Sequence, residues 1–234
     1  MLSVNAGTLN ARGAGAGAAR FLSEGMLESL LEINRECLAL FAEQATASAF
    51  ESHPTLRQIA DLARALDERA CWRAAACPFL LVDAGFADPE RWQRGAGPRV
   101  ADSECFPSAP FFSVPRASEL ARLVLVYAWS LVLTERSAAR LVLGIHPRCA
   151  RLLSDCTVPQ VHELAQSHAG WLRPRWLVRA KFWRALLLAA AEGDDPSLER
   201  VRIHGVQLLA AEAWSVPLAR GPAGGVSART AGGG

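Results

Sequence analysis

Lysine is almost missing from this chain: of the 25 Lys and Arg residues, only Lys181 is a lysine. Tyrosine occurs once and methionine twice. The use of arginine almost alone, together with abundant alanine and glycine, indicates a compositional bias that acts on the whole chain. A high arginine count is therefore weak support for phosphate binding. The net charge of only +2 also gives no global field that attracts a polyanion.

Closely paired cysteines and long apolar runs are absent as well. The six cysteines are dispersed without a CxxC pair, whereas zinc sites usually contain such pairs. Residues 1–20 lack the apolar segment of a signal peptide. The longest apolar runs, such as LARLVLVYAWSLVL, are shorter than the roughly 20 residues that span a bilayer. We therefore expect a cytoplasmic protein with no cofactor, no metal and no membrane partner.

Motifs of the common enzyme classes are not present. The chain has no GxSxG, no glycine-rich phosphate loop and no HExxH. Cys77 precedes a proline and is a conceivable nucleophile, but buried and unreactive cysteines are far more common. Asp194 and Asp195 precede Pro196 in a turn, where a carboxylate caps the following helix. We expect that the protein is not an enzyme.

The residues that are abundant predict an all-α, helical bundle-type fold. Just over half of the chain is apolar, and Ala, Leu and Arg all favour helix. The predicted organisation is a disordered tail at 1–20, a helical region at 21–93, a Gly/Pro-rich linker at 94–116, a second helical domain at 117–218 and a disordered tail at 219–234. Charge is unevenly spread, because residues 1–116 carry 11 basic and 14 acidic side chains, whereas residues 117–220 carry 13 and 9.

Local signals in residues 138–165 predict three helices joined by short turns. Gly144 supplies the left-handed position that ends the first helix. Pro147 opens a short second helix, and Thr157 caps the third, with Pro159 and Gln160 in its first turn. Helices of this length joined by such turns are also typical of a helix-turn-helix.

The segment LGIHPRCARLLSDCTVPQVHELAQ resembles, without a gap, the corresponding part of FlhD, a subunit of the bacterial flagellar transcriptional regulator. The resemblance is sharp over 143–166 and weak over 117–213. It is carried by Leu143, Gly144, Ile145, Ala150, Leu153, Thr157, Pro159, Gln160, Leu164 and Ala165. It implies an all-helical, dimer-forming protein that acts in transcription, bound to a partner regulator subunit and through it to promoter DNA.

The segment WLRPRWLVRAKFWR at 171–184 combines basic and aromatic residues without a carboxylate. A helix that starts at Pro174 places Trp176, Ala180, Trp183 and Leu187 on one apolar stripe, with basic side chains beside it. This pattern is most typical of core packing with a solvated basic rim, while a phosphate-binding face or a membrane surface also fits. The candidate DNA contacts are Arg173, Arg175, Arg179, Lys181 and Arg184. The candidate contacts with a partner are Trp171, Trp176 and Trp183.

Two hypotheses for function follow. The first is a transcriptional regulator-like helical protein that works as an oligomer, with a partner subunit, on DNA. The alternative is a helical interaction adaptor or scaffold that does not bind nucleic acid, since Trp and Arg are also favoured at protein interfaces. An open basic face formed by residues 173–184 favours the first hypothesis, and neutralisation of that face by Asp155 or Glu163 favours the second.

Overall fold

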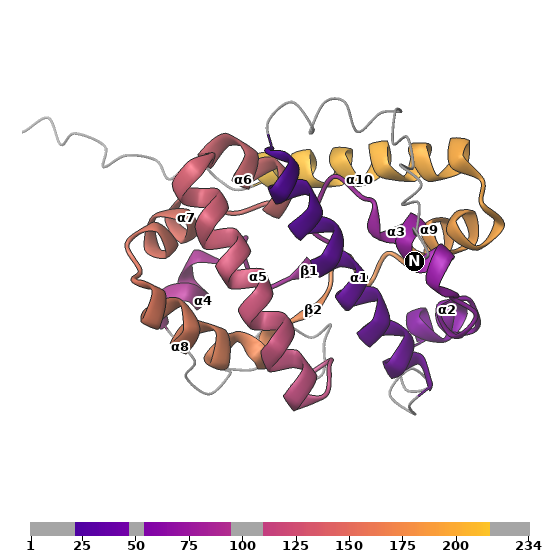
Figure 1. Cartoon of the computed structure of the whole chain (residues 1–234), viewed down its shortest axis with the longest axis horizontal. Helices are drawn as coiled ribbons and strands as arrows, with labels where there is room; N and C mark the ends of the chain where they lie inside the picture. Colours follow the sequence, from indigo (N-terminus) through magenta and orange to yellow (C-terminus); the bar gives the residue numbers. More distant parts are fainter. Residues whose placement is uncertain (1–21, 47–53, 95–109, 216–234) are drawn as a thin grey trace, which may run out of the picture.

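The structure, a computed structural model, describes residues 22–46, 54–94 and 110–215. These residues form ten α-helices, a 3-10 turn and two strands of two residues each (Figure 1). The predicted all-α class is confirmed. The predicted tails at 1–20 and 219–234, and most of the predicted linker, lie outside the described residues.

The two halves of the chain follow a similar order of elements: a long helix, shorter helices, a short strand and another helix. The first half contains α1 (Glu24–Thr46), α2 (Pro54–Arg64), α3 (Glu68–Ala75), β1 (Val82–Asp83) and α4 (Pro89–Arg94). The second half contains α5 (Val114–Thr134), α6 (Arg136–Leu143), α7 (Pro147–Ser154), α8 (Val158–His168), the 3-10 turn η2 (Ala169–Trp171), β2 (Arg173–Pro174), α9 (Ala180–Glu192) and α10 (Asp195–Ser215).

The halves interlock around one hydrophobic core. The long helices α1 and α5 pack against each other, and β1 pairs antiparallel with β2 at the centre of the molecule (Figure 1). The helix after each strand crosses to the other half, because α9 packs on α2 and α3, whereas α4 packs on α7. Core residues come from both sides of the predicted 94–116 linker, and α5 begins inside that range. The two helical regions therefore share a core.

Helix ends in the second half form where the sequence signals predicted them. Gly144 ends α6 with a φ of 62°, in the left-handed region that glycine adopts without strain. Pro147 opens α7, and Thr157 precedes α8, where its N–H donates to the Gln160 side chain at 2.8 Å. Asp194 caps α10, since its carboxylate accepts from the Ser197 N–H at 3.1 Å. These local predictions are confirmed.

A buried asparagine attaches the segment before β1 to α1. Asn34 is fully buried, and its amide nitrogen donates to the Ala75 and Phe79 carbonyls at 3.1 and 2.9 Å. Its side-chain oxygen accepts from the Leu81 N–H at 2.8 Å. Because these bonds satisfy the amide, its burial is not penalised and the path of the chain into β1 is fixed.

Helix α5 is longer than its apolar sequence run. Residues Pro115–Thr134 are, by length and composition, long and apolar enough to cross a membrane, which corrects the expectation of runs too short to do so. Half of this stretch is buried inside the fold. Core helices pass the same test, so this property does not assign a membrane location.

Candidate nucleic-acid interface

The segment 171–184 is not the single helix that its pattern predicted. Arg173 and Pro174 form β2, residues 175–178 form a turn, and α9 begins only at Ala180. Within the turn, Trp176 has a φ of 53°, a conformation that a helix excludes and a bulky residue rarely adopts. The Arg175 N–H donates to the Leu81 carbonyl at 2.7 Å. This long-range bond extends the pairing of β2 with β1 and prevents a helix from starting at Pro174.

Arg175 lies inside the protein, which corrects its assignment as a DNA contact. Its side chain is 5% exposed. Its Nε donates to the Leu80 carbonyl at 3.0 Å and its Nη2 to the Leu143 carbonyl at 2.6 Å. Its Nη1 lies 3.7 Å from Oε2 of Glu212, on α10. Arg175 therefore connects the strand region, the end of α6 and α10, and has no surface to offer a phosphate.

The three candidate partner contacts are also buried within this chain, so their assignment to an interface is wrong and the core-packing interpretation is confirmed. Trp183 is fully buried, stacks on Phe41 with ring centroids 4.8 Å apart, and donates to the Arg175 carbonyl. Trp176 packs edge-on against Phe79 and donates to Glu212. Trp171 packs under the Arg91 guanidinium, whose carbon lies 4.1 Å from the ring centroid.

The remaining basic residues of the segment lie at or near the surface. Arg173 is half-buried and donates to the Trp171 carbonyl, whereas Arg179, Lys181 and Arg184 are exposed around the start of α9. Within the described residues, no ion pair joins Asp155 or Glu163 to Arg179, Lys181 or Arg184. Three exposed cations at the positive end of a helix give a small surface, and their contact with DNA stays a prediction.

A second basic surface, which the sequence analysis missed, lies on α6 and α7. Arg136 and Arg140 on α6 are exposed, as are Arg148 and Arg151 on α7. We call these four residues the basic strip. The signal was present in the sequence, because residues 136–154 contain these four arginines and no carboxylate. The whole-chain arginine bias concealed it.

Helices α7 and α8 are positioned by contacts at their apolar faces. Cys149 and Leu153 of α7 and Val161 and Ala165 of α8 are buried. The turn 155–157 between the helices is held to α5, since the Trp129 indole donates to the Cys156 carbonyl at 3.0 Å. The outer face of α8 carries exposed His162, Glu163 and Gln166. Both helices pack on α5, and they follow each other across a tight turn, which is the order of elements in a helix-turn-helix.

A buried histidine closes the end of α8. His168 is 1% exposed and lies between the rings of Trp92 and Trp171, with centroid distances of 4.8 and 4.0 Å. Its Nδ1 lies 2.8 Å from the Leu164 carbonyl and donates to it, which leaves Nε2 unprotonated. Burial lowers the pKa of His168 to about 4, and the nearby Arg91 charge adds to this effect. The imidazole is therefore a neutral, structural group at physiological pH.

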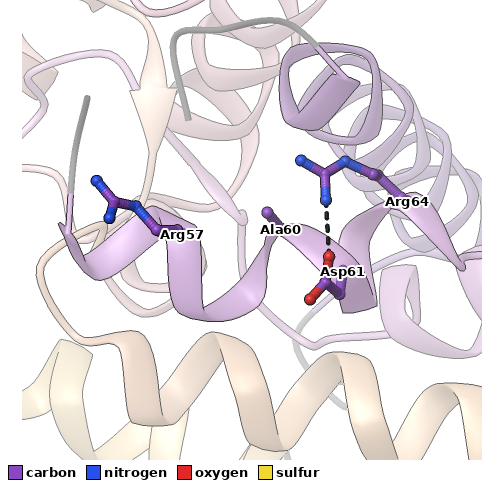
Figure 2. A pocket seen from close by; sticks show the side chains of 4 residues that line it. All are labelled: Arg57, Ala60, Asp61 and Arg64. Carbon is purple, nitrogen blue, oxygen red and sulfur yellow. Dashed lines mark hydrogen bonds and ion pairs between the residues drawn. The ribbon is translucent and has the colours of Figure 1, made fainter. Parts of the chain in front are cut away.

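Sites for a small molecule or metal have little support. A hollow of about 490 Å³ is lined by Arg57, Ala60, Asp61 and Arg64, all on α2, and Arg64 donates to Asp61 at 2.7 Å (Figure 2). A hollow lined by about two turns of a single helix lacks the convergent apolar walls of a ligand site. Across the described ranges, no group of three or more His, Cys, Asp and Glu is placed to hold a metal ion.

Comparison with known proteins adds no relative: no family model, no curated protein and no solved structure matches the chain. The FlhD-like resemblance of residues 143–166 therefore rests on its sequence positions alone.

Proposed function

We propose that this chain is a transcriptional regulator-like helical protein of the cytoplasm, which acts on promoter DNA together with a partner regulator subunit. The proposed role is one of binding, without a catalytic step or a cofactor. A homodimer, which the FlhD-like resemblance implies, is the simplest oligomer that provides two such surfaces.

The observation that carries the proposal is the α7–α8 pair. The turn 155–157 is fixed to α5 through Trp129, and the N-terminus of α8 is fixed by Thr157 and Gln160. A helix that reads bases must be held rigidly and must present polar side chains at its exposed face. The face formed by His162, Glu163 and Gln166 supplies hydrogen-bond donors and acceptors of the kind that base edges require.

An apolar patch beside this pair supports a protein partner. The patch consists of Val126, Leu133, Leu152 and Val158, which are exposed on α5, α7 and α8, and both α7 and α8 pack against α5. Leu133 alone keeps 52% of its surface exposed. Exposed apolar groups of this number on neighbouring elements are typical of an interaction surface. They favour an adaptor or scaffold that does not bind nucleic acid as much as they favour the transcriptional regulator-like function.

The two functions are separated by the affinity for duplex DNA as a function of salt. The chain is measured alone, and again after affinity re-isolation from a lysate so that a tightly bound subunit remains with it. DNA binding predicts an affinity that falls linearly on a log–log plot against salt, by about 0.9 per phosphate contact. Absence of binding in both preparations, or binding that is indifferent to salt, contradicts a DNA-binding role and leaves the adaptor.

The apolar patch is tested by the double substitution Leu133→Glu and Val158→Glu. Two charges in a desolvated interface abolish partner retention, because a buried unpaired carboxylate is strongly unfavourable. Intact salt dependence of DNA binding in this variant assigns the patch to the partner alone. Unchanged partner retention contradicts the role of the patch. The matched control Leu188→Glu changes an exposed leucine on α9, outside the patch.

A further inference from the structure

The basic strip has no internal partner. Its four guanidinium groups make no ion pair and no side-chain hydrogen bond with any other described residue. Arg116, which bridges Glu36 and Glu43, and Arg200, which donates to Ser197, differ in this respect. Among the described residues the exposed Arg179 and Arg184 also make no ion pair, so the lack of a partner alone does not single out the basic strip. Cations without a partner keep their full capacity for an external anion.

The four charges lie on two successive helices that three residues, 144–146, connect. Arg136 and Arg140 are four residues apart on α6, and Arg148 and Arg151 are three apart on α7, so each pair shares a helix face. His146, the N-cap residue of α7, lies between the two helices and therefore between the two pairs of arginines in the sequence. Burial lowers the pKa of His146, and the positive charges of Arg148 and Arg140 lower it further. Arg140 and Arg148 are therefore close enough to act on the same imidazole.

The helices that precede β1 in the first half carry basic and acidic side chains together. Helices α2 and α3, which precede β1 as α7 and α8 precede β2, mix basic residues with Asp61, Asp67 and Glu68. There, Arg64 is paired with Asp61 at 2.7 Å. Residues 136–154 contain no carboxylate, although the exposed Glu135 and Asp155 flank them, whereas α2 and α3 carry Asp61 and Glu68 within the helices themselves.

We propose that the basic strip binds the phosphate backbone of duplex nucleic acid and so positions α8 at the bases. This inference rests on the proposed DNA-binding function and gives it a surface other than residues 173–184. Arginine is well suited to the task, because its planar fork binds phosphate oxygens bidentately. Phosphate contacts fix the register of a protein on the duplex, and a separate element reads the sequence.

An anionic membrane is the weaker candidate for this surface. Membrane-surface helices direct a broad apolar face outward, whereas α6 and α7 direct theirs inward, with Val142, Leu143 and Leu153 buried. The outward apolar side chains are the separate leucines Leu141 and Leu152. The tryptophans of 171–183, which would anchor such a surface, are in the core.

The test compares two matched double substitutions in the full chain. Arg140→Gln with Arg148→Gln removes two charges from the basic strip, and Arg179→Gln with Arg184→Gln removes two from the start of α9. All four side chains are exposed, so thermal melts of both variants match the unsubstituted chain. The probe is a fluorescent 30-base-pair duplex of mixed sequence, titrated from 50 to 250 mM KCl. Arg140→Lys with Arg148→Lys keeps the charge and serves as rescue.

We expect the basic-strip variant to lower the log–log salt slope by about 1.8 and the affinity at 0.1 M salt by roughly 50-fold, since each lost phosphate contact accounts for about 0.9 of slope. The α9 variant keeps the original slope, and the lysine variant recovers most of it. An equal or larger loss in the α9 variant overturns the inference while DNA binding stands. Failure of the unsubstituted chain to bind the duplex overturns the proposed function itself. Binding to phosphatidylserine vesicles without duplex binding makes the strip a membrane contact and overturns the inference as well.

Discussion

Arg175→Met separates a structural arginine from a DNA-contacting one. Arg175 donates to the carbonyls of Leu80 and Leu143 and lies beside Glu212, all within a site that is 5% exposed. Methionine fills a similar volume but donates no hydrogen bond. Two carbonyls then lose a charged donor, which costs roughly 1.5–3 kcal/mol for each bond. Glu212 is 40% exposed and recovers solvation, so its lost ion pair adds little. The expected loss of unfolding free energy is about 3–5 kcal/mol.

The assay is equilibrium unfolding in urea, followed by tryptophan fluorescence and by far-ultraviolet circular dichroism. Arg179→Met is the matched control, because that side chain is exposed and its loss changes the stability by about 0.5 kcal/mol or less. Below its unfolding transition, the Arg175→Met protein binds duplex DNA with an unchanged salt slope. Equal stability of the two variants contradicts the structural role of Arg175. A lower salt slope in the folded Arg175→Met protein contradicts the conclusion that Arg175 makes no contact with DNA.

Two further predictions concern the core. Gly205→Ala brings a methyl group into overlap with Cζ of the buried Phe79, and this overpacking lowers the unfolding free energy by about 1–3 kcal/mol. In a double-mutant cycle, Phe79→Leu restores part of the free energy that Gly205→Ala loses. Strictly additive effects of the two substitutions on the unfolding free energy contradict the contact. The pKa of His168 is about 4 in the folded state, whereas the ordinary pKa of a histidine is 6.5. The folded state therefore binds fewer protons, and stability is full above pH 6.5 and falls as the pH drops towards 4, by about 2 kcal/mol between pH 7 and pH 5. His168→Phe removes this dependence of the unfolding free energy on pH, whereas the control His162→Gln retains it. An unchanged pH profile in His168→Phe contradicts the assignment of His168 as a neutral, buried imidazole.

Local chemistry made parts of the fold predictable. Gly144, Pro147 and Thr157 mark helix boundaries through the conformation of their own backbone or through bonds within one turn, so their effects can be inferred without the rest of the chain. The all-α class was likewise predictable, because it rests on the abundance of Ala, Leu and Arg, which favour helix through their own backbone preferences.

Long-range contacts account for what the sequence pattern missed. The spacing of Trp176 and Trp183 fits a helical stripe, yet the bonds from Arg175 to Leu81 and Leu143 bring this segment beside β1 and convert its start into strand and turn. These contacts join Arg175 to residues that lie 94 positions (Leu81) and 32 positions (Leu143) before it, and they leave no local signature.

The candidate site was only partly predictable, because exposure decides which basic residues are available. Arg175 and Arg179 belong to the same basic and aromatic segment, but Arg175 is buried and Arg179 is exposed. Conversely, the helix-capping residues are the clearest local signal in the segments that contain Arg140 and Arg148, and the positive charge of these segments is less conspicuous. A tally of carboxylates along the chain, rather than of arginines, would have identified the basic strip.

The most direct test of the account is hydrogen–deuterium exchange of the full chain, measured with and without a saturating mixed-sequence duplex at low salt. Contact through the basic strip and α8 predicts slower amide exchange in residues 136–168 when DNA is present, and unchanged exchange at residues 179–184. Protection confined to 179–184, or no protection anywhere along the chain, contradicts the central claim that α6, α7 and α8 form the nucleic-acid interface.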